Sequence, residues 1–428
     1  MGKTASLERA LHKAAWRLLP FLLLLYILAF LDRVNVSYAK QALMRDVGLS
    51  EAVYAFGASI FFLGYALFEV PSNLIMHRVG ARAWMCRIMI TWGLLSAAMM
   101  FVSSASSFYV LRFLLGVAEA GFFPGVILYL TYWFPEKNRG PMMGLFYFGA
   151  PLAQIFGGPL SGLLLDLDGL GGLRGWQWMF AVEGLLASAV GVWTYTYLNN
   201  RPADARWLSV DERHALQTVL DAEDGVKAGH ATGGVMAALR QPRLLHFGLI
   251  YCLIQVSVYG VTFYLPSHVA RLLNRDTGFI VGLVSAIPWV CALLAAYALP
   301  RLVDRLGTRN GIAASALLLA GVGIAVSSTS LPALALVALC VATAGFIGAQ
   351  PIFWTFPTNE LTGVRAAGGI AFINALGAVG GFVAPNLKTA AEKAWGTAAA
   401  GQFALAATTV TGAVLIFFLR QRPLGPAR

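Results

Sequence analysis

Charged residues are scarce in this sequence. Only 12% of its 428 residues are Asp, Glu, Lys or Arg, whereas 58% are hydrophobic, and the mean hydropathy is +0.70. Water-soluble domains carry about twice that share of charged residues. The composition therefore excludes a soluble globular protein and predicts a chain that crosses a membrane many times.

Cysteine and histidine are also rare, with four and six residues respectively. The cysteines lie singly in apolar segments, without the paired spacing of a disulfide framework or a metal site. The histidines are scattered, and no glycine-rich phosphate loop is present. These absences argue against a membrane-embedded enzyme and predict neither a metal nor a cofactor. A sensor would need a signalling domain, and the polar segments are too short to form one.

Basic residues exceed acidic residues by 31 to 20, which gives a formal charge of +11. In a soluble protein this excess would suggest a nucleic-acid partner, but here the basic residues are concentrated in alternate loops between the predicted spans. With the N-terminus in the cytoplasm, about 22 of the 31 Lys and Arg residues lie on the cytoplasmic side. The excess therefore predicts membrane topology, with both termini cytoplasmic, and no binding of nucleic acid.

Apolar segments of about 20 residues, long enough to cross the hydrocarbon core, recur along the chain. Twelve are predicted, so the fold class is an all-α membrane protein in contact with the lipid bilayer. The first follows a basic segment without a visible cleavage site and is predicted to be retained. The predicted spans are 16–39, 52–76, 82–103, 107–132, 141–164, 177–198, 244–269, 278–300, 311–329, 332–357, 366–388 and 397–420.

One long polar segment divides the spans into six plus six. We predict an N-terminal six-helix half (1–198), a cytoplasmic linker (199–243) and a C-terminal six-helix half (244–428). Within the linker, Ser209 and Glu212 have the spacing at which each side chain caps the other residue's backbone N–H, which predicts a short helix. Residues 223–234 are rich in glycine and small residues and predict a flexible linker.

Two short repeats support this division. The segments HRVGAR (77–82) and DRLGTR (304–309) share Arg-x-Gly-x-Arg at an offset of 227 residues, and GGPLSG from Gly157 is echoed by GGFVAP from Gly380 at an offset of 223. Two parallel repeats of six spans, with a site at their interface, form a recurrent transporter architecture.

Four charged residues lie inside predicted spans: Asp32 and Arg33 in the first, and Arg112 and Glu119 in the fourth. A charge at the centre of a bilayer helix costs roughly 2.5–3.5 kcal/mol, so such residues are expected to be paired or to face a polar cavity. Seven residues are nearly two helical turns, so Arg112 and Glu119 are expected to line one cavity. Asp32 and Arg112 both fall in the outer half of the membrane and are expected to face each other.

These residues suggest transport of an anion with a proton. The planar fork of Arg binds a carboxylate through two parallel hydrogen bonds. A carboxylate that takes Arg112 from an acidic partner leaves that partner as a less compensated buried anion, which then binds a proton. Anion and proton favour each other's binding, as symport requires. The alternative is that the charges only form salt bridges between spans, or that Arg33 reaches the membrane interface.

The C-terminal half has neutral and aromatic side chains where the repeat would place charge. Four of them, Gln255, Tyr259, Trp354 and Asn374, are predicted to contact the rest of the ligand. Two further acidic residues within spans have a different predicted role. Glu69 and Glu183 are expected to pair with a helix end or a loop arginine.

The chain resembles the major facilitator superfamily in its Arg-x-Gly-x-Arg loops, although His77 stands where the first loop normally has an acidic residue. It resembles the anion:cation symporter family more narrowly. Segments that carry this resemblance are LDRVN in span one, GYALFEVPSNLIMHRVGAR in span two, RFLLGVAEAGFFPG in span four and PIFWTFPTNELTGVRAAGGIAFINALGAVGGFVAP in spans ten and eleven.

The resemblance implies the major facilitator fold of 12 transmembrane helices and alternating access. It implies proton symport of a small organic acid such as a hexuronate, another sugar acid, tartrate or phthalate. Arg112 then meets the substrate carboxylate together with Arg33, and Asp32 and Glu119 couple the proton, the only coupling ion expected. It further implies a monomer that imports its substrate across a bacterial inner membrane. An organic-anion exchanger or a uniporter without proton coupling is the alternative.

Overall fold

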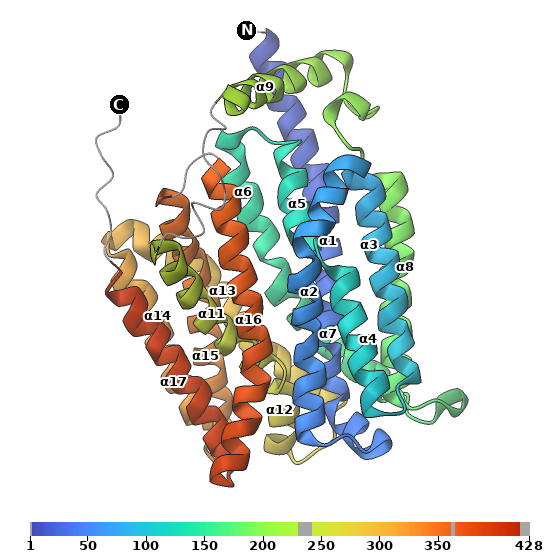
Figure 1. Cartoon of the computed structure of the whole chain (residues 1–428), viewed down its shortest axis with the longest axis vertical. Helices are drawn as coiled ribbons and strands as arrows, with labels where there is room; N and C mark the ends of the chain where they lie inside the picture. The colour runs from blue at the N-terminus through green and yellow to red at the C-terminus, as the bar shows by residue number, and fades with distance from the viewer. Residues whose placement is uncertain (1, 230–241, 361–363, 420–428) are drawn as a thin grey trace.

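The computed structural model describes residues 2–229, 242–360 and 364–419, and within them all regular secondary structure is helical (Figure 1). Eleven helical segments there are long and apolar enough to span a membrane. The predicted span 366–388 lies within a further long helix, α16 (Val364–Trp395). The predicted all-α fold with twelve spans is therefore confirmed.

The other helices are α1 (Gly2–Val47), α2 (Glu51–Val79), α3 (Ala81–Ala98), α4 (Ala105–Glu119), α5 (Phe122–Thr131), α6 (Glu136–Tyr147), α7 (Gly149–Leu165), α8 (Gly175–Tyr197), α9 (Val210–Gly229), α11 (Pro242–Thr262), α12 (Leu265–Leu273), α13 (Phe279–Leu306), α14 (Arg309–Val326), α15 (Pro332–Glu360) and α17 (Ala398–Phe417).

Helices α1 to α8 form an N-terminal bundle, and α11 to α17 form a C-terminal bundle, drawn in blue to green and in yellow to red in Figure 1. The bundles meet mainly where α7 packs on α13 and where α2 packs on α16. Helix α9 lies near the N-terminus, at what we call the α9 end, and α12 lies toward the opposite end, the α12 end. The predicted domain boundaries at 198 and 244 stay predictions, because residues 230–241 of the linker lie outside the described part of the chain.

Three predicted spans are each broken into two helices: α4 and α5, α6 and α7, and α11 and α12. Between α4 and α5, Gly121 has a φ of +85°, a backbone conformation that ends a helix and suits glycine. Pro124 follows in the first turn of α5, where it removes no helical hydrogen bond. The continuous apolar pattern predicted one helix, whereas the structure ends α4 at Glu119.

The two Arg-x-Gly-x-Arg segments share a local structure. Gly80 follows α2 with a φ of +96°, and Gly307 follows α13 with a φ of +70°. Side chains with a Cβ rarely adopt such angles. The repeat therefore ends one helix in each bundle at a glycine with a positive φ, although ψ is 146° at Gly80 and 0° at Gly307.

The predicted capping interaction is present at the start of α9. The Ser209 N–H donates to the Glu212 carboxylate at 2.9 Å, and the Glu212 N–H donates to the Ser209 hydroxyl at 3.2 Å. Lys13 of α1 also donates to this carboxylate, which lowers the pKa of Glu212 below its usual value. These contacts hold α9 on the N-terminal bundle.

The linker is more helical than the sequence predicts. Helix α9 continues to Gly229, and Glu223 within it forms an ion pair with Arg139 at 3.0 Å. Glu223 also accepts a hydrogen bond from the Glu136 N–H at the start of α6. These contacts stabilise residues 223–229 as helix, and the rest of the predicted flexible linker, 230–234, lies outside the described residues.

Glycines bring α7 and α13 unusually close. A Cβ added to Gly282 would lie 2.0 Å from the carbonyl oxygen of Gly158. Nearby, Asp166 accepts a hydrogen bond from the Phe279 N–H at the first turn of α13, at 2.9 Å. Small residues at a helix crossing let two backbones pack closely within a membrane. This crossing joins the two bundles.

We predict that Gly282→Ala destabilises the protein by roughly 1–3 kcal/mol, because the added methyl group forces the bundles apart. The thermal unfolding midpoint in detergent measures the effect. Gly311→Ala is the matched control, since the nearest atom to its added Cβ, in Thr308, is 3.9 Å away. Equal midpoints for the two variants would show that this crossing is not tightly packed.

Candidate functional site

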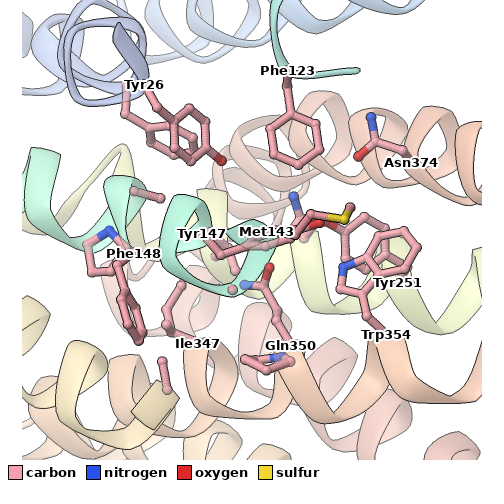
Figure 2. A pocket seen from close by; sticks show the side chains of 18 of the residues that line it. Tyr26, Phe123, Met143, Tyr147, Phe148, Tyr251, Ile347, Gln350, Trp354 and Asn374 are labelled. Atoms are coloured by element: carbon pink, nitrogen blue, oxygen red, sulfur yellow. The ribbon is translucent and has the colours of Figure 1, made fainter. Parts of the chain in front are cut away.

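A cavity of about 830 Å³ lies between the two bundles (Figure 2). Helices α1, α2, α5, α6 and α7 contribute to one side of it, and α11, α13, α15 and α16 to the other. Its wall is rich in aromatic rings, with Tyr26, Phe123 and Tyr147 from one bundle and Tyr251 and Trp354 from the other. A mainly apolar cavity with a few polar groups is the usual form of a small-molecule site.

The cavity is open at the α9 end. Leu145, Tyr297, Arg301 and Thr358 line it and are exposed. Tyr297, Arg301 and Thr358 lie on α13 and α15, close to the ends that these helices present at the α9 end, whereas Leu145 lies near the other end of α6. A solute could therefore enter or leave on that side.

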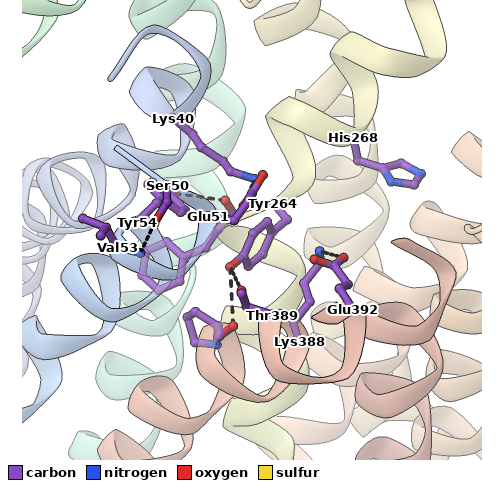
Figure 3. A network of polar contacts seen from close by, with 12 residues as sticks. Lys40, Ser50, Glu51, Val53, Tyr54, Tyr264, His268, Lys388, Thr389 and Glu392 are labelled. Carbon is purple, nitrogen blue, oxygen red and sulfur yellow. Dashed lines mark hydrogen bonds and ion pairs between the residues drawn. The ribbon is translucent and has the colours of Figure 1, made fainter. Parts of the chain in front are cut away.

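Contacts between the bundles close the α12 end (Figure 3). The ring of Tyr264 lies between two lysines, with the Lys40 nitrogen 4.6 Å and the Lys388 nitrogen 4.1 Å from its centre. The Tyr54 hydroxyl, from the N-terminal bundle, donates a hydrogen bond to the carbonyl oxygen of Phe263 at 3.2 Å. The structure thus shows a cavity with access from one side.

Arg33 places a positive charge in the cavity wall. One end of its guanidinium pairs with the Glu119 carboxylate, and Nη1 donates to the Tyr259 hydroxyl of the other bundle at 3.0 Å. Its Nε has no hydrogen-bond partner. Arg33 is only 9% exposed, so the alternative in which it reaches the membrane interface is wrong.

The charge of the cavity has one sign. Among its described lining residues only Arg33 and Arg301 carry a formal charge, and both are positive. Arg301 lies at the open end, where it donates to the carbonyl oxygen of Tyr297. The arrangement is suited to an anion, because an anionic ligand meets positive charge and no carboxylate in the wall.

Glu119 lies behind Arg33 and depends on it. It is the last residue of α4, at the negative end of the helix dipole, and is 1% exposed. Its second carboxylate oxygen has no hydrogen-bond partner. An ionised Glu119 therefore requires the adjacent guanidinium of Arg33.

Arg112 is not part of the cavity wall, contrary to the expectation that it lines the cavity with Glu119. It is fully buried, and its Nη2 donates to the carbonyl oxygen of Ala58 in α2 at 3.0 Å. The reason is the tight packing of α4 on α2, since a Cβ on Gly116 would lie 2.0 Å from the carbonyl oxygen of Phe61. Arg112 interacts electrostatically with Glu119 without forming an ion pair.

Asp32 also points away from the cavity. Neighbouring residues of a helix are about 100° apart around its axis, so Asp32 and Arg33 face different sides of α1. The Asp32 carboxylate accepts hydrogen bonds from the Trp92 indole N–H at 2.8 Å and the Ser96 hydroxyl at 2.7 Å, both on α3. The expectation that Asp32 faces Arg112 is therefore wrong.

The four residues predicted from the C-terminal half, Gln255, Tyr259, Trp354 and Asn374, all lie in the cavity wall. The Gln255 side-chain oxygen and the Trp354 indole N–H have no hydrogen-bond partner. Both atoms are buried as well as unpartnered. Asn374 instead donates to Glu69 of the other bundle at 2.9 Å. Contact of these side chains with a ligand stays a prediction.

Glu69 and Glu183 do not pair with arginine. Glu69 accepts the hydrogen bond from Asn374, and Glu183 accepts one from the Ser161 hydroxyl at 2.7 Å. In the described part of the chain, neither carboxylate has a Lys or Arg nitrogen within 4.0 Å. The expected arginine partners are missing because both side chains are buried between helices, away from the basic loops.

Gln154 and Tyr65 are among the polar residues of the cavity wall that were not singled out from the sequence. Gln154 is the one amide in the predicted span 141–164, and an isolated amide in an apolar span is a usable signal. Tyr65 also lines the cavity. No comparable signal identified it, because aromatic residues pack in membrane helices throughout this sequence.

A family model described as Major Facilitator Superfamily matches residues 22–385. The chain belongs to the major facilitator superfamily. Its fold is similar to that of the xylose transporter XylE from E. coli in an inward open conformation, with a TM-score of 0.75 over 96% of this chain and 97% of that chain, at 15% identity.

Three sequence relatives are also transporters by name. The chain is 49% identical to the inner membrane transport protein RhmT of Escherichia coli, over 97% of this chain and 96% of that protein. It is 41% identical to a putative tartrate transporter of Agrobacterium vitis (96% and 91%) and 39% identical to the putative metabolite transport protein NicT of Pseudomonas putida (95% and 93%). These matches confirm the family resemblance, and the superfamily consists of membrane transporters, not enzymes.

We predict a favourable coupling of about 1 kcal/mol or more between Arg33 and Glu119. Arg33→Gln alone leaves a buried, unpaired carboxylate, which typically costs 3–5 kcal/mol. Adding Glu119→Gln removes that charge, so the double variant should lose less stability than the two single variants added together. Unfolding midpoints of the four proteins give the coupling, and strictly additive losses would contradict the ion pair.

Proposed function

We propose that this membrane transporter carries a small organic carboxylate together with a proton by alternating access. The observation that supports it best is Arg33, whose guanidinium lies in the wall of a cavity without any acidic lining residue among those described. Its Nη1 is held by a neutral hydroxyl, which a carboxylate can replace, whereas its unpartnered Nε is buried. A carboxylate in the cavity can therefore reach the planar fork of Arg33.

Proton coupling follows from the partner of Arg33. A substrate carboxylate that shares the guanidinium weakens its pairing with Glu119. Glu119 has no other cation within ion-pair distance among the described residues and lies at the negative end of α4. It then binds a proton more readily, so anion and proton binding favour each other.

This mechanism transfers the role first expected for Arg112 to Arg33. Arg112 and Glu119 remain in electrostatic contact, so Arg112 stabilises the buried carboxylate without reaching the cavity. A contact between Arg112 and the substrate carboxylate, which the family resemblance implies, would require a cavity that extends to α4. We assign substrate binding to Arg33, and proton coupling to Glu119 with Asp32 as a second acidic group.

The proposed setting is a bacterial inner membrane, with both termini cytoplasmic and the protein working as a monomer without a cofactor. The excess of Lys and Arg on one side of the predicted spans supports this orientation. The cavity then faces the cytoplasm in this structure, and the closed α12 end faces outward. Uptake requires the opposite conformation, in which that end opens and the α9 end closes.

We predict that one or more organic acids raise the thermal unfolding midpoint of the purified protein. The panel should include sugar acids, tartrate-like diacids and aromatic acids. A ligand at about 100 times its dissociation constant adds about 2.7 kcal/mol to the free energy of unfolding. Because one proton is taken up with the anion, affinity should rise by up to about tenfold for each unit that the pH falls.

The matched variants for this assay are Arg33→Gln and Arg301→Gln, which remove the two positive charges of the cavity wall. Arg33→Gln should lose the response, whereas Arg301→Gln at the open end should keep it within about twofold. A panel without any response, or an unchanged response in Arg33→Gln, would count against the carboxylate site.

We predict that Glu119→Gln abolishes accumulation driven by a pH gradient and retains exchange of labelled substrate across proteoliposomes. Gln can still accept a hydrogen bond from Arg33 but cannot take up the coupled proton. Glu8→Gln is the matched control, because it removes a carboxylate from an exposed position. Undiminished accumulation in Glu119→Gln would favour the exchanger or uniporter alternative.

A further inference from the structure

Two buried carboxylates of the N-terminal bundle, Asp32 of α1 and Glu183 of α8, do not line the cavity. Asp32 is 1% exposed and Glu183 of α8 is 0% exposed, and neither belongs to the cavity wall. In the described residues, no Lys, Arg or His nitrogen lies within 4.0 Å of either. Two ionised carboxylates close together in an apolar interior repel each other and are poorly solvated, so one of them is expected to hold a proton.

The hydrogen bonds around Asp32 favour its ionised form. Its two oxygens accept from the Trp92 N–H at 2.8 Å and the Ser96 hydroxyl at 2.7 Å, with a longer contact to the Asn35 amide nitrogen at 3.4 Å. An indole N–H and an amide NH₂ are donors only. Carboxylates surrounded by donors are stabilised as anions.

The surroundings of Glu183 are different. One oxygen accepts from the Ser161 hydroxyl at 2.7 Å, whereas the other, Oε2, has no partner. Asn35 lies close enough to interact with the Glu183 carboxyl group, and its own side-chain oxygen also lacks a donor. A proton on Glu183 would supply that donor.

Within the described part of the chain, no positively charged side chain compensates an ionised Glu183. The titratable groups that act on it come from α1, namely Asp32 and the Tyr38 hydroxyl, and neither carries positive charge. Ser161 of α7 is neutral. On the side of α3, Gly93 and Ala97 pack against α8. The four charges of spans one and four already sum to zero, so an ionised Glu183 would leave the bundle interior with an excess negative charge.

We propose that Glu183 is a proton-binding site distinct from Glu119: it holds a proton as a neutral acid while Asp32 is ionised, and Asn35 connects the two. The Glu183 hydroxyl donates to the Asn35 oxygen, and the Asn35 amide nitrogen donates to Asp32. A single proton, taken from water, is bound by the pair. This site goes beyond the proposed function, because it does not depend on which solute is carried.

Infrared spectroscopy of the purified protein without substrate tests this assignment, because a neutral carboxylic acid has a C=O stretching band separate from the bands of a carboxylate. The difference spectrum between wild type and Glu183→Gln should contain one neutral-acid band and no carboxylate bands. Asp32→Asn is the matched control and should remove carboxylate bands instead. The assignment is overturned if Glu183→Gln removes carboxylate bands, or if the neutral-acid band disappears in Asp32→Asn.

Ser161→Ala provides a second test that keeps Glu183 in place and applies even where Glu183→Gln does not fold. Removing the hydrogen bond from Ser161 to the acid's carbonyl oxygen should shift the neutral-acid band to higher frequency. An unshifted spectrum would mean that the proton is not on Glu183. Because no substrate is present, failure of this proposal is distinguishable from failure of carboxylate transport.

Discussion

The structure depends on the cost of placing charge inside a membrane. Arg33 and Glu119 come from helices that are far apart in sequence, and each would be strongly unfavourable alone in an apolar interior. Their pairing fixes α1 against the end of α4 and positions the guanidinium in the cavity wall. The ion pair is therefore a structural contact and also the group that an incoming anion would disturb.

Features of the backbone fix the positions of Arg33 and Glu119 relative to each other. The left-handed Gly121 ends α4 directly after Glu119, so the carboxylate lies at a helix terminus and not in the middle of a continuous span. On the other side, Tyr259 of α11 accepts a hydrogen bond from Arg33 and links the ion pair to the C-terminal bundle. A change at Arg33 thus alters contacts in both bundles. A transport cycle in which two bundles rock against each other requires such a link.

The sequence was sufficient to predict the fold class, the twelve spans, the capped helix from Ser209 and the presence of four charged residues inside the spans, which are buried in the structure. It was less informative about the direction in which each charged side chain points. Periodicity places Arg112 and Glu119 on one helix face, but only the close contact at Gly116 determines that Arg112 faces α2. The break after Glu119 was hidden because apolar residues continue through it. The hydrogen bond from Asn374 to Glu69 joins residues 305 positions apart, and no local pattern predicts such a contact.

The closed α12 end is built from contacts that can separate without breaking an ion pair. Lys40 pairs with Glu51 at 2.8 Å within the N-terminal bundle, and Lys388 pairs with Glu392 within α16. Among the described residues, the contacts that cross between the bundles toward this end include the contact of Lys40 with the Tyr264 ring and the hydrogen bond from Tyr54 to Phe263. They also include hydrogen bonds from Asn386 to Ser59 at 2.8 Å and from the Phe279 N–H to Asp166 at 2.9 Å.

Opening this end therefore leaves each lysine with its carboxylate. The contacts that are lost include a cation–π contact, worth about 0.5–2 kcal/mol, and hydrogen bonds, each worth about 0.5–1.5 kcal/mol when both groups are neutral. Individually weak contacts of this kind can be exchanged for others in a second conformation, so a bound solute can shift the population between the two. Charged contacts within each bundle and weaker contacts between the bundles are thus the arrangement that alternating access needs.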